Sequence, residues 1–496
     1  MFSHKTPITP LTLPWSVLGL TTPVRVVIDS RQLQAGEVFL ACPGEYTDGR
    51  DFIQAAIKQG AAAVLWDSDG GFEWTYGDTP NWGIASLRQY MGLVAADALN
   101  HPGQHLDIIG VTGTNGKTSI TQWLAQALDQ LGQPCGIMGT VGNGFWERLQ
   151  TSTHTTLDAW SVQQWLQTFV EQGAKAVAME VSSHGLDQFR VNGVPFDSAV
   201  FTNLTRDHLD YHGSMAEYGA CKSRLFFWDG LKHAIINVDD DFGQELAVEA
   251  RAANRSHVVS YGFADGADVH IERYQPSLTG TDIAFRTPWG EVSVHTQLIG
   301  RFNAQNLAAC VALLCAQGFA LADVARVLAD IKPATGRMDG IRVDGQPLVV
   351  VDYAHTPDAL EKAVSTLHEM KQDGSQVWCV FGCGGNRDKG KRPLMGKAAA
   401  DNADVVVVTS DNPRLEDPQS IIDDILTAIP NAEHVIVDRA EAIAYAIAQA
   451  SCNDIVLIAG KGHETYQDVG GHKNHFSDFE CAQAALAHRS RTHIKK

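Results

Sequence analysis

Short apolar runs separated by polar stretches of helical length make up most of the chain. In the first hundred residues, the runs at 24–28 and 37–41 predict strands, and residues 51–60 predict a helix ahead of the apolar run AAAVLW. A small α/β domain is therefore expected. It ends near the helix-breaking turn at 101–103, where a new apolar strand begins.

The middle of the chain repeats strand-like runs at 106–111, 176–181, 198–204 and 234–238, with helical stretches between them. This alternation predicts a mostly parallel sheet flanked by helices. Residues 258–298 differ, because their short alternating segments are typical of antiparallel strands. We interpret them as a β subregion of the same central domain.

A third α/β pattern follows Arg337, and four of its strands run into loops rich in Gly, Asp, Arg or Lys, namely DYAHTPD, GCGGNRDKGKR, SDNPR and AGKGHE. In open parallel sheets the ligand crevice lies beyond the carboxyl ends of the strands. The four loops are therefore expected to converge on one site. The strands of this pattern are predicted at 348–351, 377–381, 405–409, 434–437 and 455–458.

Length and composition limit the class of protein. A chain of 496 residues is too long for one hydrophobic core, so about three domains are expected. The formal charge of -19 opposes binding to nucleic acid or anionic lipid, and no uninterrupted apolar run is long enough to span a membrane. Nine scattered cysteines without paired CxxC clusters favour a reducing compartment, and Cys379 and Cys383 are interpreted as core residues. A cytoplasmic, monomeric protein is expected.

The strand LDIIGV, the loop GTNGKTS and an amphipathic helix follow one another directly. This context suits a phosphate cradle, in which backbone N–H groups and the helix N-terminus face the phosphates, Lys117 reaches the outer ones and Thr118 binds Mg2+. Val111 stands where the strict pattern has glycine. A glycine-rich surface turn is the alternative. The predicted ATP-binding residues of the loop are Gly113, Thr114, Asn115, Gly116, Lys117, Thr118 and Ser119.

Two further polar segments of the central domain are candidates for metal chemistry. Glu180 ends an apolar strand, where a carboxylate beside a phosphate loop is able to hold Mg2+. His208 and His212 have the spacing of a zinc helix, but Leu209 replaces the glutamate that HExxH requires, so metalloprotease chemistry is not supported. His208 remains open as a metal or substrate contact, whereas Asp210 and His212 are treated as structural.

Basic residues gather in the C-terminal part. The segment GCGGNRDKGKRP combines close-packed glycines with Arg387, Lys389, Lys391 and Arg392, but it lacks the GxGxxG spacing of a dinucleotide fold. Arg414 follows a strand in SDNPR, where a guanidinium fork is able to take a carboxylate bidentately. A solvated surface charge is the alternative interpretation of such an arginine.

Taken in order, GTNGKTS, EVSSHGL, FTNLTRDHLDYHG, NAQN, GRMD, VDYAHTPDAL, FGCGGNRDKGKR, DNPR and AGKGHE resemble the Mur ligase family of peptidoglycan synthesis over the whole chain. The resemblance implies an α/β fold of three domains. A UDP-substrate-binding domain spans 1–103, a central P-loop ATPase spans 104–335, and a doubly wound, Rossmann-like sheet that brings in the amino acid spans 336–496. It also implies an amide-bond ligase that uses ATP and Mg2+ to add meso-2,6-diaminopimelate to UDP-N-acetylmuramoyl-L-alanyl-D-glutamate through an acyl phosphate.

The resemblance also assigns site residues. Lys222 matches a lysine that CO2 carboxylates in these ligases, and an unmodified lysine paired with Glu180 is the alternative. His154 stands where the family commonly has Asn. Catalytic and metal-binding roles fall to Lys117, Thr118, Glu180, His208 and carboxylated Lys222; nucleotide contacts to Asn306, Arg337 and Asp352; UDP contacts to Ile28, Ser30, Glu45, Tyr46 and Thr47; dipeptide contacts to His154, Thr155, Thr156, Ser182, Gln188 and Arg190; and diaminopimelate contacts to Arg387, Asp411, Asn412, Pro413, Arg414, Gly460 and Glu464.

Other classes of protein fit less well. A lysine-adding Mur ligase lacks the arginine of DNPR, because lysine has no second carboxylate for it to bind. Folylpolyglutamate synthase shares the phosphate loop, but the IDSR segment and DNPR argue against it. A P-loop switch would carry NKxD, which is absent from the sequence. A non-catalytic scaffold with the same fold is distinguished by its failure to release phosphate when both substrates are present.

Overall fold

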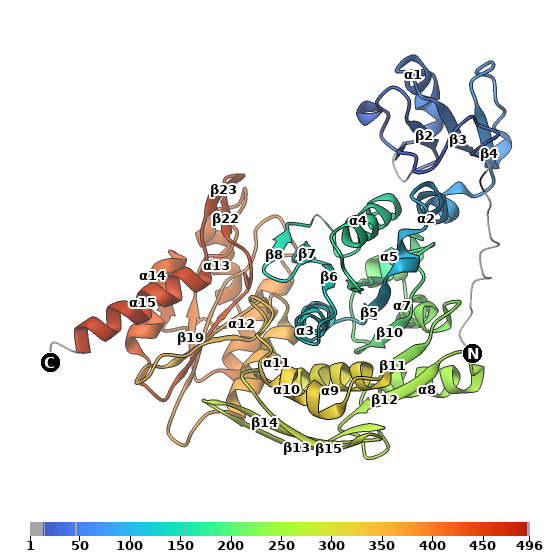
Figure 1. The fold of residues 1–496 in the computed structure, drawn as a ribbon. Helices are drawn as coiled ribbons and strands as arrows, with labels where there is room; N and C mark the ends of the chain where they lie inside the picture. Colours follow the sequence, from blue (N-terminus) through green and yellow to red (C-terminus); the bar gives the residue numbers. More distant parts are fainter. Residues whose placement is uncertain (1–12, 14, 45–46, 153, 494–496) are drawn as a thin grey trace. The chain divides into compact units, whose positions relative to one another are not determined.

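The computed structural model of the protein describes residue 13 and residues 15–44, 47–152 and 154–493, and Figure 1 shows its ribbon. The described chain packs as two compact units. The first contains the described residues up to His270, with Thr287–Trp289 and Ala308–Val324, and the second contains Ile271–Arg286, Gly290–Leu307 and the described residues from Ala325 onward.

The first unit begins with a four-stranded parallel sheet in the order β1-β2-β3-β4. Successive residues of a strand face opposite sides, so Val38 and Leu40 join one apolar cluster while Phe39 and Ala41 join another. Burial on both faces explains why these strands read as continuous apolar runs. The elements are β1 (Val26–Val27), η1 (Ser30–Gln32), β2 (Val38–Ala41), η2 (Gly49–Phe52), α1 (Ile53–Lys58), β3 (Ala63–Asp67), η3 (Asp69–Gly71), β4 (Asn81–Ile84) and α2 (Leu87–Ala98).

The larger sheet of the first unit has the order β12-β11-β10-β5-β9-β6-β7-β8, parallel from β12 to β6 and antiparallel through β7 and β8. Helix α3 packs against β5, β6 and β9. The elements are η4 (Pro102–His105), β5 (Asp107–Thr112), α3 (Lys117–Gln130), β6 (Cys135–Met138), β7 (Asn143–Phe145), β8 (Arg148–Gln150), α4 (Ala159–Glu171), β9 (Ala176–Glu180), α5 (Ser183–Asp187), β10 (Ser198–Phe201), α6 (Leu209–His212), α7 (Met215–Ser223), η5 (Arg224–Phe227), β11 (His233–Asn237), α8 (Asp241–Ala253) and β12 (His257–Gly262).

The strand register in this sheet aligns the ends of three strands. Thr112 pairs with Phe201, and Val111 pairs with Glu180. The carboxyl ends of β5, β9 and β10 therefore lie at one edge, so the loops that follow them are neighbours.

The segment from 258 to 298 forms strands, as its alternation predicts, but β12 and β13 pair in parallel and not in the expected antiparallel manner. β13 pairs with β12 through Val269 and His270, and the remainder of β13 belongs to the second unit with β14 and β15. The elements are β13 (Val269–Ser277), β14 (Gly280–Thr287), β15 (Gly290–Thr296), α9 (Arg301–Ala316) and α10 (Leu321–Ala329).

The C-terminal sheet has the order β16-β17-β21-β18-β19-β20, parallel except for β16. Val350 and the residues on the same face of the sheet pack with α11, α12 and α13, whereas Val349 and Val351 on the opposite face pack with α14 and α15. The elements are β16 (Asp339–Ile341), β17 (Leu348–Asp352), α11 (Pro357–His368), β18 (Val377–Phe381), α12 (Lys391–Asn402), β19 (Val405–Val408), α13 (Pro418–Leu426), β20 (His434–Val435), α14 (Arg439–Gln449), β21 (Ile455–Ala459), β22 (Tyr466–Val469), β23 (His472–His475) and α15 (Asp478–His493).

Helices on both faces make this sheet doubly wound, and the predicted α/β fold class is confirmed. Cys379 and Cys383 are buried with thiol pKa values raised by that burial to about 12, so the core interpretation of both is also confirmed. Among the helices of the described residues, none combines the length and the apolar character needed to cross a bilayer.

Candidate active site

The loop between β5 and α3 has the backbone shape of a phosphate cradle. Gly113 and Gly116 have φ angles of 146° and 88°, which favour glycine. A Cβ on Gly113 would lie 1.8 Å from Thr202 Oγ1, so a side chain would not fit there. Helix α3 begins at Lys117, and its first N–H groups face the loop. The strand, loop and helix predicted from GTNGKTS are all present.

The cradle is held from the loop after β10. Thr114 N–H donates to the Asn203 carbonyl at 2.9 Å, and Asn115 N–H donates to Asn203 Oδ1 at 3.0 Å. Thr202 Oγ1 donates to the Asn115 carbonyl at 2.6 Å. These bonds fix the loop before any ligand arrives, which lowers the ordering cost of binding.

Lys117 curls over its own loop. Its Nζ donates to the carbonyls of Gly113 at 2.8 Å and Thr114 at 2.9 Å. An ammonium that contacts neutral carbonyls at the mouth of the loop is able to exchange them for anionic phosphate oxygens, which form stronger charge-assisted hydrogen bonds.

Glu180 ends β9 as a buried carboxylate beside the phosphate loop. Its Oε1 accepts from Thr118 Oγ1 at 2.9 Å and from Thr140 N–H at 2.9 Å, and its Oε2 accepts from Thr140 Oγ1 at 3.1 Å. A Cβ on Gly139 would lie 2.3 Å from Oε1, so this glycine leaves room for the carboxylate. The carboxylate and hydroxyl oxygens form the hard donor set that Mg2+ prefers. Thr140 was missed from the sequence, because it follows a different strand and carries no motif.

Lys222 is a buried amine next to the same loop. Its Nζ donates to the Gly113 carbonyl at 2.9 Å and lies 4.4 Å from the Tyr218 ring centroid. Burial, and after it the charge of Lys117, hold the pKa of Lys222 well below its ordinary value. Within the described part of the chain it forms no ion pair with Glu180, so the alternative pairing is not observed. A neutral amine is the nucleophilic form of lysine.

His208 follows β10 and stays exposed. Its Nε2 lies 3.3 Å from Asp207 Oδ2, and its ring packs edge-on against His184 at 4.8 Å between centroids. His212 Nε2 is 2.9 Å from Ser183 Oγ, which agrees with a structural role. Throughout 15–44, 47–152 and 154–493, no group of three or more His, Cys, Asp and Glu side chains is arranged to hold a metal. A metal here would thus need Thr118 and ligand oxygens in addition.

The residues predicted for the dipeptide are continuous with Glu180. Thr156 Oγ1 donates to the Glu180 carbonyl at 2.9 Å and accepts from Ser182 N–H at 3.0 Å. Arg190 donates to the Thr156 carbonyl at 2.8 Å and to Gln188 Oε1 at 2.6 Å and 3.0 Å.

The segment before Thr156 completes this group. Thr155 Oγ1 lies 3.1 Å from Thr140 Oγ1, within hydrogen-bond distance, which ties it to the Glu180 network. His154 is exposed, and its carbonyl accepts from Ser152 Oγ at 2.7 Å. The structure thus gathers all six predicted dipeptide residues in one region.

Three of the residues predicted for UDP lie at the carboxyl edge of the N-terminal sheet. Ile28 and the buried Ser30 follow β1, and the exposed Thr47 lies in the loop after the adjacent parallel strand β2. Neighbouring parallel strands end at the same edge, so these loops are close. Glu45 and Tyr46 lie outside the described residues.

The predicted nucleotide residues Asn306, Arg337 and Asp352 belong to the second unit. Asp352 ends β17 and accepts from the N–H groups of Met338 at 2.7 Å and Ala354 at 2.8 Å, and burial raises its pKa. The Arg337 guanidinium lies 4.8 Å from the Tyr353 ring centroid, and its buried Nε has no hydrogen-bond partner among the described residues. Asn306 is buried and donates to Asn303 Oδ1 at 3.1 Å.

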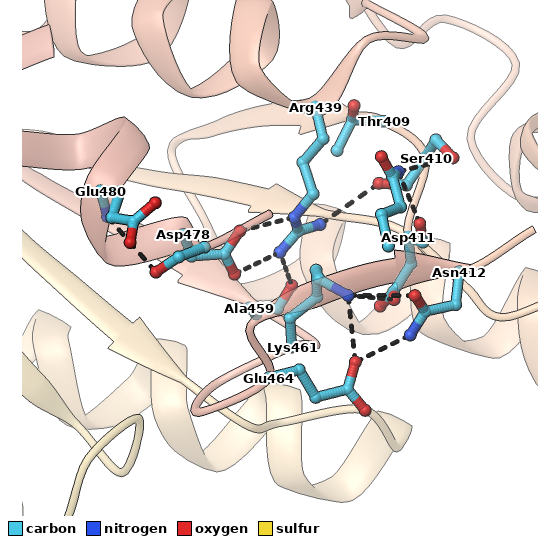
Figure 2. Close-up of polar contacts among 12 residues, drawn as sticks. Thr409, Ser410, Asp411, Asn412, Arg439, Ala459, Lys461, Glu464, Asp478 and Glu480 are labelled. Atoms are coloured by element: carbon cyan, nitrogen blue, oxygen red, sulfur yellow. Dashed lines mark hydrogen bonds and ion pairs between the residues drawn. The ribbon is translucent and has the colours of Figure 1, made fainter. Parts of the chain in front are cut away.

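Three of the four loops predicted to converge, those after β18, β19 and β21, meet, and Tyr353 of the fourth packs 5.3 Å from His463 between ring centroids. Asn412 Nδ2 donates to Glu464 Oε2 at 2.8 Å, and Gly385 N–H donates to the Asn412 carbonyl at 2.9 Å. Figure 2 shows Asp411, Asn412 and Glu464 around the buried Lys461. A Cβ on Gly460 would lie 2.6 Å from Asp411 Oδ2, which explains the glycine. Lys461 was not predicted as a site residue, although it stands in AGKGHE directly after a strand.

Arg414 and Arg387 differ in their surroundings. Arg414 is half-buried with φ 53°, and its Nη1 donates to the Gly385 carbonyl at 2.7 Å. Pro413 before it is buried, and the Pro413 carbonyl lies 1.9 Å from a Cβ built on Gly385, so this loop and the loop after β18 are in close contact. Arg387 is exposed.

One part of the expected basic cluster has a structural role. Arg392 is fully buried and binds Glu416 at 2.9 Å and Asp424 at 2.8 Å, and Lys389 lies 3.3 Å from Glu416. Arg392 therefore neutralises acids on and before α13, and its charge is not directed to a ligand.

Three models of Mur ligase domains match the chain in order. The model of the Mur ligase family catalytic domain matches residues 24–98, that of the Mur ligase middle domain matches 111–314, and that of the Mur ligase glutamate ligase domain matches 336–462. The protein belongs to the Mur ligase family, and the resemblance drawn from the motifs is confirmed.

Particular members of the family are similar over nearly the whole chain. A protein of Neisseria meningitidis serogroup A named UDP-N-acetylmuramoyl-L-alanyl-D-glutamate--2,6-diaminopimelate ligase is 59% identical over 99% of this chain and 100% of its own. A solved structure of a ligase with that name is 39% identical, with a TM-score of 0.72 over 94% of this chain and 95% of its own. The MurF ligase of Thermotoga maritima in complex with ADP shares the fold at 19% identity, with a TM-score of 0.62 over 95% and 99% of the two chains.

Proposed function

We propose that this protein is an ATP-dependent ligase that adds meso-2,6-diaminopimelate to UDP-N-acetylmuramoyl-L-alanyl-D-glutamate, and that it acts as a monomer in the cytoplasm during peptidoglycan precursor synthesis. The observation that carries the proposal is the 59% identity over 99% of the chain to a ligase named for this reaction. The half-buried Arg414, two residues after the Asn412 that donates to Glu464, supports the choice of amino acid, because diaminopimelate offers a carboxylate and an ammonium at its distal end.

The reaction needs an activated carboxylate. Transfer of the γ-phosphoryl group of ATP to the free γ-carboxylate of the D-glutamyl residue forms an acyl phosphate and ADP. The amine of diaminopimelate then attacks the acyl carbon, a proton leaves the nitrogen, and phosphate departs as the amide bond forms. Phosphate is a far better leaving group than the oxide of a carboxylate, and this difference is why ATP is consumed.

The phosphate loop performs the first step in this proposal. The N–H groups of residues 113–119 receive the phosphates, and Lys117 moves from the carbonyls of Gly113 and Thr114 to the terminal phosphate oxygens. Asn306, Arg337 and Asp352 hold the rest of the nucleotide. Preorganised N–H donors and an ammonium stabilise the charge that develops during transfer.

Mg2+ fits the residues on the other side of the loop. Thr118 and Glu180 supply adjoining oxygens 2.9 Å apart, and His208 and a carboxylated Lys222 complete the protein donors that would hold the ion. When bound, Mg2+ supplies Lewis-acid polarisation of phosphoryl oxygens. The two hydrogen bonds from Thr140 keep the Glu180 carboxylate oriented, and its burial excludes bulk water.

Carboxylation of Lys222 follows from its surroundings. The depressed pKa leaves the Nζ lone pair free to attack CO2, which forms an N–C bond and releases one proton to give a carbamate anion. The change places a carbamate anion beside the Lys117 ammonium, so the two groups attract each other.

The substrate contacts follow the domain order. Residues 1–103 hold UDP through Ile28, Ser30 and 45–47; residues 104–335 hold ATP and the dipeptide; and residues 336–496 hold the amino acid. The dipeptide contacts are His154, Thr155, Thr156, Ser182, Gln188 and Arg190, and the amino-acid contacts are Arg387, Asp411, Asn412, Pro413, Arg414, Gly460 and Glu464.

Phosphate release tests the function directly. Release of ADP and phosphate is expected only when the UDP-muramoyl dipeptide and diaminopimelate are both present, and replacement of diaminopimelate by lysine or glutamate is expected to abolish most of it. Lys117→Ala is expected to lose about 100-fold or more in rate. Equal turnover with lysine would refute the amino-acid assignment, and native turnover by Lys117→Ala would refute the role of the loop.

A further inference from the structure

Lys461 is a fully buried ammonium in the loop after β21, and it lies among residues that we propose for the amino acid (Figure 2). Its Nζ donates to Asn412 Oδ1 at 3.1 Å and to Glu464 Oε2 at 3.0 Å, and lies 3.9 Å from Asp411 Oδ1. A lysine is seldom fully buried unless it is paired. These contacts supply the pairing, so the residue is part of a built polar network.

The ammonium determines which way Asn412 faces. Lysine only donates hydrogen bonds, so the atom of Asn412 that faces Nζ is the carbonyl oxygen. The same oxygen accepts from Asp468 N–H at 2.9 Å, which confirms its orientation. The amide nitrogen is therefore directed at Glu464 Oε2, to which it donates at 2.8 Å.

Glu464 is held by one oxygen only. Oε2 accepts from both Lys461 and Asn412, whereas Oε1 has no hydrogen-bond partner in the part of the chain that the structure describes. A carboxylate fixed through one oxygen presents the other in a defined direction. That oxygen is available to a cationic group of a ligand.

The network also reaches the arginine of the pocket. Arg414 N–H donates to the Asp468 carbonyl at 2.9 Å, and Asp468 N–H is bonded to Asn412 Oδ1. Lys461 is thus linked through Asn412 and the backbone of Asp468 to Arg414, and directly to Glu464. The two groups that would take the distal ammonium and carboxylate are connected through one buried cation.

We propose that Lys461 is a positioning residue for the amino-acid subsite, which sets the orientation of Glu464 and of the Asn412 amide without touching the substrate. The inference rests on the proposed function, because it takes the subsite to bind a zwitterionic amino acid. Without the ammonium, the partly buried Glu464 and the buried Asp411 would lose the cation that they share. Glu464 would then turn toward water, and its vector to the ligand would be lost.

The test compares apparent KM values for the three substrates. Lys461→Met keeps the length of the side chain without its charge, and Lys461→Gln keeps a donor without its charge. The control Lys397→Met removes an exposed lysine of α12 that pairs with Asp401. We expect Lys461→Met to raise KM for diaminopimelate about 10-fold or more, with KM for ATP and for the UDP-dipeptide within about 2-fold of wild type, because only one subsite loses its orientation. The KM of Lys461→Gln for diaminopimelate is expected to lie between those of wild type and Lys461→Met.

Thermal unfolding shows whether each variant is folded, so a change in the orientation of Glu464 is distinguished from a loss of structure. A general loss of structure would raise all three KM values together, which would overturn the proposal, as would an unchanged KM for the amino acid in either folded variant. Should Lys461→Met not fold, Lys461→Gln carries the same comparison. If wild type adds lysine and not diaminopimelate, the proposed function fails, and the KM comparison is made with lysine and still decides the role of Lys461.

Discussion

Replacing Arg414 with alanine removes the guanidinium of the loop after β19 that we propose to bind the distal carboxylate of diaminopimelate. Its single hydrogen bond among the described residues runs from Nη1 to the Gly385 carbonyl at 2.7 Å, so the rest of the fork is available for a carboxylate. Arg414 has φ 53°, and alanine at that position bears the same backbone strain. The comparison therefore isolates the side chain.

The size of the effect follows from burial. Loss of one partner of a buried hydrogen-bonded charge pair costs about 2 to 5 kcal/mol. Arg414 is half-buried, so the lower end applies, and about 2 kcal/mol corresponds to a decrease of roughly 30-fold in kcat/KM for diaminopimelate. Lysine has no distal carboxylate, so its slow turnover is expected to change by less than about 3-fold.

The assay measures ADP release with diaminopimelate and lysine in parallel. Arg414→Lys is the matched control, because it keeps the charge but loses the bidentate fork, and an intermediate effect is expected. Loss of the bond to Gly385 costs only about 1 kcal/mol of stability, so the variant is expected to fold. Unchanged kinetics for diaminopimelate in Arg414→Ala would refute the assignment of this arginine.

Three further predictions concern single residues. With 13C-labelled bicarbonate, wild type is expected to show a carbamate NMR signal that Lys222→Met lacks, and identical spectra would exclude carboxylation of this buried amine. Gly92→Ala places a Cβ 1.7 Å from the Asn192 carbonyl oxygen and is expected to cost about 1 to 3 kcal/mol in denaturant unfolding, whereas Gly266→Ala, with open space around it, is expected to be neutral. Burial raises the pKa of Asp339 from 3.8 to about 6, so its folded form loses stability as pH rises through that window. The gain in thermal midpoint of Asp339→Asn over wild type should therefore grow from pH 4 to pH 6, and a constant gap would contradict it.

The sequence alone determined the elements that depend on neighbouring residues. A strand, a glycine turn and a helix N-terminus are contiguous in GTNGKTS, so local backbone preferences predict the cradle that residues 113–119 form. Apolar periodicity likewise predicted β5, β9, β17 and β21, because burial on both faces of a parallel strand leaves an unbroken apolar run. The order of motifs then indicated the family.

Only the tertiary structure decided the partners of charged side chains, because these come from segments far apart in the chain. Arg392 stood out only as one of the basic residues of GCGGNRDKGKRP, but the fold brings Glu416 and Asp424 against it. Thr140 carried no motif, and the AGKGHE motif did not reveal the partners of Lys461, yet strand order places Lys461 between Asn412 and Glu464 and Thr140 on Glu180. The charge of a buried group depends on distance and solvent access in three dimensions, and sequence spacing contains neither.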